Sequence, residues 1–224
     1  MKNLVRLIVS VVIAATYPTA VVLADCSPDS VLTLLRDKVD SYEIIRVDYH
    51  REVHSVLFGE RAPEDGKLWI APPSRYRVET KGQVYVRGTD TLWTYSEGTN
   101  QVTIRTGDLS KAEFGPAGFF GSLQDDFILV GCSEDRVGDF DCWKLRLASK
   151  TETAAIQRVT LWVDKSAKIP RAAEYVDYNE ETSNVRFTGY RFDQGKDRQR
   201  FTFSPPKGAE VITMPLKKSN RNGD

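Results

Sequence analysis

Two histidines, four positions apart, are the residues of this chain that come closest to a metal site or a pH-sensitive pair. His50 and His54 would point to the same face of an extended strand. A zinc site needs more than two protein ligands, and no third ligand accompanies this pair. We therefore expect both histidines to be solvated, and we predict neither a metal nor another cofactor.

Adjacent carboxylates offer a second possible chemistry, general acid–base catalysis. Asp125-Asp126 and Glu180-Glu181 are such pairs, but neighbouring side chains on extended backbone diverge. The sequence contains no Gly-x-Ser-x-Gly elbow, phosphate loop or dinucleotide fingerprint, and neither histidine has an obvious nucleophile as a partner. We therefore expect the protein not to be an enzyme.

The cysteines offer a third chemistry, cross-linking. Cys132 and Cys142 flank a polar, glycine-containing segment, 133–141, that lies between two strand-like runs. In an oxidising compartment they could close a hairpin as a disulfide, which would leave Cys26 over. A metal site would need more ligands than this segment provides. We expect the Cys132–Cys142 disulfide.

The first 24 residues indicate the compartment. Lys2 and Arg6 precede an apolar run, 7–15, that is too short to span a bilayer comfortably, and Ala24 offers a small residue for cleavage. This layout is typical of a secretory signal peptide, and the alternative is a buried N-terminal helix. The pattern favours export, cleavage after Ala24 and a periplasmic protein that begins at Asp25.

Cys26 raises the alternative of a lipid anchor. The residues Leu23-Ala24-Asp25-Cys26 resemble a lipoprotein signal, but an acidic residue directly before the cysteine is a poor fit. Plain cleavage is therefore favoured. Mass spectrometry of the mature N-terminus would distinguish a free protein from a membrane-tethered one.

Size and charge limit the remaining classes of function. Removing 24 of the 224 residues leaves 200, enough for a single domain with one good-sized core. Without Lys2 and Arg6, 29 of the 31 basic residues remain against 31 acidic ones. A net charge near minus two gives no electrostatic reason to expect nucleic acid or an anionic membrane surface as a partner.

One helix is predicted at the start of the mature chain. Ser27 can cap it and Pro28 suits its first position. Apolar residues then recur at helical spacing up to Ser41. We expect an amphipathic helix over 28–41 whose apolar side needs a surface to cover.

The rest of the chain is predicted to be mainly β. From Glu43 the pattern changes to a period of two, and short runs are separated by tight turns. The expected strands are 43–56, 66–70, 75–80, 83–87, 91–96, 101–105, 127–131, 142–147, 156–163, 171–178, 184–192 and 198–203. Such short connections predict one antiparallel sheet of about eleven or twelve strands, which curls into an incomplete, half-open barrel. The segment 108–123 does not alternate and is expected to form a helical insertion over the concave side.

Large apolar side chains recur in phase along these strands. Tyr76 and Val78 share a face, as do Trp93 and Tyr95, and the same spacing recurs at Leu145, Leu161, Phe201 and Phe203. Two interpretations stay open, an aromatic-rich core and a concavity that holds a ligand. Composition alone favours the plain core.

Four stretches resemble the outer-membrane lipoprotein carrier family (LolA). Residues 66–79, GKLWIAPPSRYRVE, have its Gly-x-Leu-Trp…Pro-x-x-aromatic arrangement, and 88–95, GTDTLWTY, are similar to its Gly-x-x-Leu-Trp-x-Tyr strand. Residues 115–123 occupy the place of its lid, and 201–211, FTFSPPKGAEV, are similar to its Phe-x-Phe-x-Pro-x-Gly-x-x-Val ending. The resemblance covers essentially the whole mature chain.

The resemblance implies a half-open barrel whose helical lid covers a hydrophobic cavity for lipoprotein acyl chains. It also implies an inner-membrane donor and an outer-membrane acceptor as partners of a monomeric carrier. The residues expected in the cavity and lid are Tyr76, Val78, Trp93, Tyr95, Phe114, Phe119, Phe120, Leu145, Leu161, Phe201 and Phe203.

One departure from the family pattern concerns lid closure. Where the family often has a basic residue before the proline of the Leu-Trp…Pro stretch, this chain has Pro72 before Pro73. The closing mechanism is therefore left open, and the cargo could be a different lipid. The alternative function is a lipid-sensing or protein-interaction module of the envelope.

Overall fold

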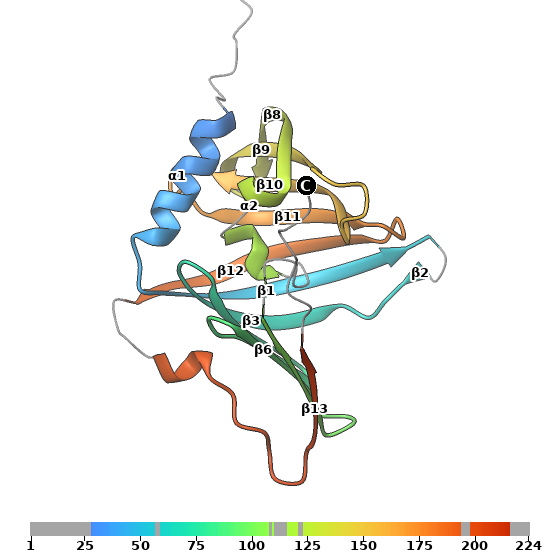
Figure 1. The fold of residues 1–224 in the computed structure, drawn as a ribbon. Helices are drawn as coiled ribbons and strands as arrows, with labels where there is room; N and C mark the ends of the chain where they lie inside the picture. The colour runs from blue at the N-terminus through green and yellow to red at the C-terminus, as the bar shows by residue number, and fades with distance from the viewer. Residues whose placement is uncertain are drawn as a thin grey trace, which may run out of the picture.

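One strongly curved sheet contains every strand of the described residues (Figure 1). The computed structural model describes residues 28–56, 59–107, 109, 116–120, 123–193 and 198–215. The expected signal peptide, Cys26 and Phe114 lie outside these residues. The strand order is β13-β7-β6-β5-β4-β3-β1-β12-β11-β10-β9-β8, and β2 pairs with β1.

The strands are β1 (Ile44–Ser55), β2 (Gly59–Glu60), β3 (Glu64–Ala71), β4 (Arg75–Thr80), β5 (Gln83–Arg87), β6 (Thr91–Ser96), β7 (Gln101–Thr106), β8 (Phe127–Val137), β9 (Phe140–Ser149), β10 (Ile156–Asp164), β11 (Pro170–Asp177), β12 (Thr182–Asp193) and β13 (Glu210–Pro215). The helices are α1 (Pro28–Asp40), the 3-10 helix η2 (Pro116–Phe120), α2 (Leu123–Asp126) and the 3-10 helix η3 (Arg198–Phe201).

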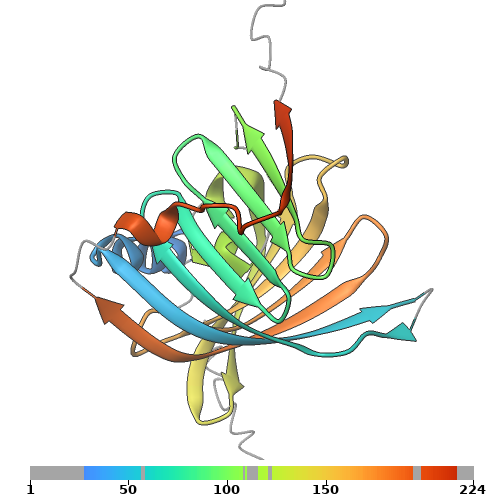
Figure 2. The ribbon, with the colours of Figure 1, turned by 90° about the horizontal axis from the view of Figure 1, so that it is seen from below.

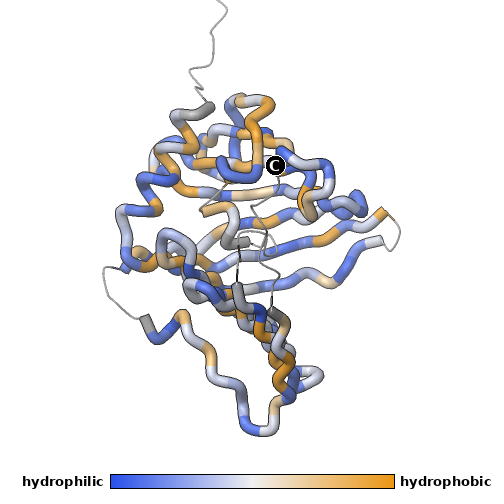
Figure 3. The backbone as a smooth tube through the Cα atoms, in the orientation of Figure 1, coloured by the Kyte–Doolittle hydropathy of each residue, from blue (hydrophilic) through white to orange (hydrophobic). Residues whose placement is uncertain are grey.

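The predicted half-open antiparallel sheet is confirmed. All neighbouring strands are antiparallel apart from β13, which runs parallel to β7. The sheet ends in two edges, β13 and β8, and so remains open. Figure 2 shows how the strands curve into a cup, and hydrophobic and hydrophilic residues alternate along them in Figure 3.

The first helix packs against the apolar interior. It spans Pro28–Asp40, close to the predicted 28–41. Its apolar side buries Val31, Leu35 and Val39, each at most 4 % exposed, in the main core. The helix therefore fills one end of the concave side (Figure 1).

The predicted strand 198–203 is wrong. Residues Arg198–Phe201 form η3, and the final strand begins at Glu210. Phe201 is 3 % exposed and packs with Trp69 on the convex face of the sheet. Figure 2 shows the chain after η3 crossing this outer side to reach β13. Two alternating aromatic residues form too short a pattern to identify a strand. The prolines that follow, Pro205-Pro206, have no backbone N–H to donate to a neighbouring strand.

Candidate functional site

Two phenylalanines fill the middle of the concave side. Phe119 and Phe120, at the end of η2, are 0 % and 2 % exposed. We call these two side chains the plug, and η2 with α2 the lid segment. The plug comes from a short helical segment that is not part of the sheet.

The plug makes ring contacts with the strands β11 and β12. The Phe119 ring lies 5.7 Å from Tyr175 and 5.8 Å from Phe187, between centroids. The Phe120 ring lies 5.3 Å from Phe187 in an edge-on geometry and 6.3 Å from Tyr190. Such pairs add about 0.5–1.5 kcal/mol each to the burial of the rings.

Four of the expected cavity residues lie on the same concave side. Val78, Leu145 and Leu161 are at most 5 % exposed and belong to the main core with the plug. Tyr76 packs on that core while remaining partly exposed. Their common placement follows from strand register, which sets Leu68 opposite Val78 and Leu161 opposite Leu145.

The other four expected wall residues lie on the convex face, and their assignment to the cavity is wrong. Val86 pairs with Trp93 and Val84 with Tyr95, which places both aromatic residues on the opposite face from Val78. The Tyr95 ring lies 5.8 Å from Phe203, and Phe201 joins Trp69 on the same outer side. These aromatic residues therefore hold the C-terminal segment against the outside of the sheet.

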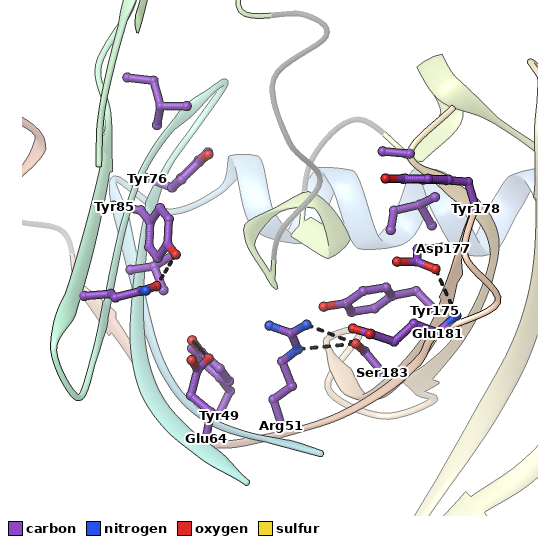
Figure 4. Close-up of a pocket in the computed structure, with 15 residues that line it drawn as sticks. Tyr49, Arg51, Glu64, Tyr76, Tyr85, Tyr175, Asp177, Tyr178, Glu181 and Ser183 are labelled. Carbon is purple, nitrogen blue, oxygen red and sulfur yellow. Dashed lines mark hydrogen bonds between the residues drawn. The ribbon is translucent and has the colours of Figure 1, made fainter. Parts of the chain in front are cut away.

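A cavity of 320 Å³ lies on the concave side, and one of its lining residues, Tyr175, contacts Phe119 of the plug (Figure 4). It lies between the strands β3–β6 on one side and β10–β12 on the other. Five tyrosines line it, Tyr49, Tyr76, Tyr85, Tyr175 and Tyr178, together with Arg51, Ser183 and three carboxylates. The site therefore combines aromatic walls with a polar floor.

Arg51 is the residue of this cavity that sequence reasoning missed. Its Nη2 and Nε donate hydrogen bonds to Ser183 Oγ at 3.1 and 3.4 Å, and its guanidinium carbon lies 5.7 Å from the Tyr175 ring. The available signal was an arginine in phase with Tyr49 and Val53, the inward-facing residues of β1. The hydrogen bond between Arg51 and Ser183 joins residues 132 positions apart, and local sequence patterns do not show such contacts.

Tyr49 forms the base of one wall through a close approach to a glycine. Its ring lies over Gly66, where an added Cβ would come within 2.3 Å of ring carbon. The Tyr49 hydroxyl donates to Glu64 Oε1 at 3.1 Å. Burial, followed by the nearby Glu64 charge, raises the pKa of Tyr49 far above its usual value, so its hydroxyl stays a donor.

The three carboxylates of the cavity already have partners. Glu64 accepts from Tyr49, and Glu181 forms an ion pair with Arg61 at 2.7 Å. Asp177 accepts the backbone N–H groups of Asn179 and Glu181 at 2.8 and 2.9 Å. These contacts hold the turn between β11 and β12 at the mouth of the cavity.

The histidine pair does not form a joint site. His50 Nδ1 lies 2.8 Å from Asp65 and its Nε2 lies 3.5 Å from Glu52, both at the surface. The hydrogen bond with Asp65 raises the pKa of His50. Among the described residues, no group of three or more His, Cys, Asp and Glu side chains could hold a metal ion.

The expected Cys132–Cys142 disulfide is wrong. Cys142 is a free, fully buried thiol, and burial raises its pKa to about 11. The tight turn of the β8–β9 hairpin sets Cys142 opposite Asp135, whereas Cys132 lies opposite Leu145. The hairpin register therefore keeps the two sulfur atoms apart.

Comparison with known proteins shows the family to which the chain belongs. Residues 41–204 match the family model of "Outer membrane lipoprotein carrier protein LolA". The chain belongs to this family. An outer-membrane lipoprotein carrier protein of Alkalilimnicola ehrlichii is 27 % identical over 210 residues, which cover 86 % of this chain and 93 % of that protein.

A second relative and a solved structure are also similar to this chain over most of its length. An outer-membrane lipoprotein carrier protein of Methylibium petroleiphilum is 27 % identical over 75 % of this chain and 82 % of its own length. The fold is similar to an uncharacterised conserved protein of Thermus thermophilus, with a TM-score of 0.57 and 16 % identity over 84 % of this chain and all of that one. In the described part of the chain, no helix has the length and apolarity to cross a membrane.

Pro72 lines a second cavity, of 350 Å³, between α1, the β3–β4 turn and the lid segment. Arg87 also lines it and is paired in register with Tyr76. The Arg87 Nε is buried with no hydrogen-bond partner among the described residues. Lys150 instead holds the lid segment, donating to the carbonyls of Gln124 and Asp125 at 2.7 and 3.0 Å.

Proposed function

We propose that the protein is a periplasmic carrier that takes acyl chains of lipoproteins, or of related lipids, into its concave side and shuttles them towards the outer membrane. The observation that carries the proposal is the plug, an apolar pair inside the cup that belongs to a separate short segment. The family and the printed names of the two relatives support lipoprotein sorting as its setting.

Burial of an acyl chain contributes more free energy than burial of the plug that it would replace. Burial of a phenylalanine side chain contributes about 1.5–3 kcal/mol, so the plug contributes about 3–6 kcal/mol. An acyl chain of roughly fifteen carbons gains on the order of 12 kcal/mol at about 0.8 kcal/mol per methylene. The chain can therefore displace the plug, while the return of the plug lowers the net affinity and favours release.

The carrier would receive its cargo from an inner-membrane donor and deliver it to an outer-membrane acceptor. Nucleic acid is not proposed as a partner, and no catalytic step is needed. A monomer suffices, because plug and walls come from one chain.

A photo-crosslinking experiment tests where the acyl chain binds. A synthetic triacylated lipopeptide with a diazirine in one acyl chain is bound to the purified protein, irradiated and mapped by mass spectrometry. Labels should fall on Val78, Tyr175 and the plug. Labels confined to the convex face around Trp93, or no labelling, would contradict the proposal.

Transfer is tested separately. The loaded protein is mixed with vesicles of outer-membrane lipid, with and without detergent-solubilised envelope proteins, and movement of the lipopeptide is measured. Transfer that depends on the carrier supports shuttling. Binding without any transfer would favour a lipid-sensing module.

A further inference from the structure

The polar floor of the concave cavity holds a guanidinium that no carboxylate neutralises directly. In the described part of the chain, Arg51 forms no ion pair, although Glu64, Asp177 and Glu181 line the same cavity. Its hydrogen-bond partner is the hydroxyl of Ser183, which is only 2 % exposed. A charged group of this kind is costly to desolvate unless something balances it.

The neighbouring carboxylates are engaged elsewhere. Glu64 accepts from the Tyr49 hydroxyl, Asp177 accepts two backbone N–H groups, and Glu181 pairs with Arg61 outside the cavity. Register places Arg51 opposite Glu64, but the Glu64 carboxylate is hydrogen-bonded to Tyr49. Asp177 ends β11, and Glu181 lies in the turn that follows it. The fold therefore keeps the arginine available.

Most of the hydrogen-bonding capacity of Arg51 faces open space. A guanidinium carries five N–H donors, and Ser183 Oγ receives those of Nε and one on Nη2. Figure 4 shows the side chain rising from the floor between Tyr49 and Tyr175. The remaining donors form a fork suited to two oxygens of one anionic group.

Tyr175 connects this fork to the plug. Its ring lies 5.7 Å from the Arg51 guanidinium carbon and 5.7 Å from the Phe119 ring, between centroids. A molecule with its polar group at Arg51 would thus have its apolar part directed at the place of the plug.

We propose that Arg51 binds the carboxylate or phosphate head of an acyl lipid whose tail displaces Phe119 and Phe120. This inference rests on the proposed function and assigns a head-group preference to the same cavity. The carboxylates at the rim repel a small free anion, so the tail supplies the affinity and Arg51 supplies the selectivity. Acetate and inorganic phosphate are therefore not expected to compete.

Displacement of the neutral fluorescent probe N-phenyl-1-naphthylamine measures the preference. The competitors are palmitate, palmitoyl lysophosphatidic acid and the neutral methyl palmitate, which share one acyl chain. The variants are Arg51→Gln, which can still donate to Ser183, and Arg51→Lys, which keeps the charge without the fork. Arg158→Gln is the matched control, because Arg158 is exposed on β10 and pairs with Glu180 at 2.9 Å.

In the wild type, at least one anionic lipid should bind roughly 10- to 100-fold more tightly than methyl palmitate, as expected for a charge-assisted contact. Arg51→Gln should abolish this preference, because anionic lipids lose their charge-assisted contact. Arg51→Lys should retain part of the preference. Arg158→Gln should retain all of it and leave methyl palmitate binding unchanged. Whether palmitate or the lysophosphatidic acid gains more identifies the head.

Equal binding of charged and neutral lipids, or a preference that survives Arg51→Gln, would overturn the inference and leave the carrier proposal standing. A protein that binds none of the three lipids would overturn the carrier proposal itself.

Discussion

Removing half of the plug should weaken the empty protein and strengthen its hold on cargo. In Phe120→Ala, the ring that contacts Phe187 at 5.3 Å and Tyr190 at 6.3 Å is lost. Burial of the ring is worth about 1.5–3 kcal/mol, and its two aromatic contacts add about 0.5–1.5 kcal/mol each. The free energy of unfolding should therefore fall by about 2.5–6 kcal/mol.

In this variant the Phe120 ring no longer competes with an acyl chain for the same space, so the free energy of its burial is not lost when the chain binds. Because the plug must leave before the chain enters, even a gain of about 2 kcal/mol from this loss corresponds to roughly 30-fold tighter binding at 1.4 kcal/mol per factor of ten. Isothermal titration with a triacylated lipopeptide measures the affinity, and urea unfolding measures the stability. Stopped-flow release of the lipopeptide should become slower by a similar factor.

Phe140→Ala is the matched control, because Phe140 is 43 % exposed on the β8–β9 hairpin, away from the main core. It should leave affinity unchanged. A Phe120→Ala protein that is folded but binds the lipopeptide no better than wild type would refute the competition between plug and cargo.

Three further outcomes test individual contacts. Gly66→Ala should push the Tyr49 ring out of place, lower the free energy of unfolding by about 1–3 kcal/mol and change the near-ultraviolet circular dichroism; an unchanged spectrum would contradict the close approach. Cys142 should resist alkylation by iodoacetamide at pH 8 until the protein is unfolded, because burial raises the pKa of its thiol to about 11; rapid labelling of the native protein would count against this placement. The pKa of His50 is raised in the folded state, so His50 should stabilise the fold below about pH 6.5 and lose that effect as pH rises through the folded pKa. NMR titration of wild type and Asp65→Asn should show a lower His50 pKa in the variant.

Local patterns predicted the elements whose cause is local. A residue type suited to capping, the proline that follows it and the apolar spacing predicted a helix over 28–41, and α1 ends one residue earlier. Tight turns and period-two runs indicated an open antiparallel sheet, because short connections allow little else. The non-alternating segment that contains Phe119 and Phe120 was correctly separated from the strands.

Alternation could not predict which face of the sheet is concave. Trp93 and Tyr95 do share a face, but it is the convex one, where Phe203 covers Tyr95. Both sides of the strands β3–β7 are covered by apolar side chains, so the usual contrast between an apolar and a polar face is weak there. The covering C-terminal segment comes from a distant part of the sequence.

The sequence by itself determined the class of fold and the presence of an apolar, aromatic-rich sheet, because propensity, turns and periodicity act between near neighbours. The tertiary structure alone decided which aromatic residues enter the cup, that Cys142 stays a free thiol opposite Asp135, and that Arg51 meets Ser183 and Tyr175 at the floor of the cavity. Each of these depends on register or on strands that pair across most of the chain, and such contacts form only when the whole sheet closes around its core.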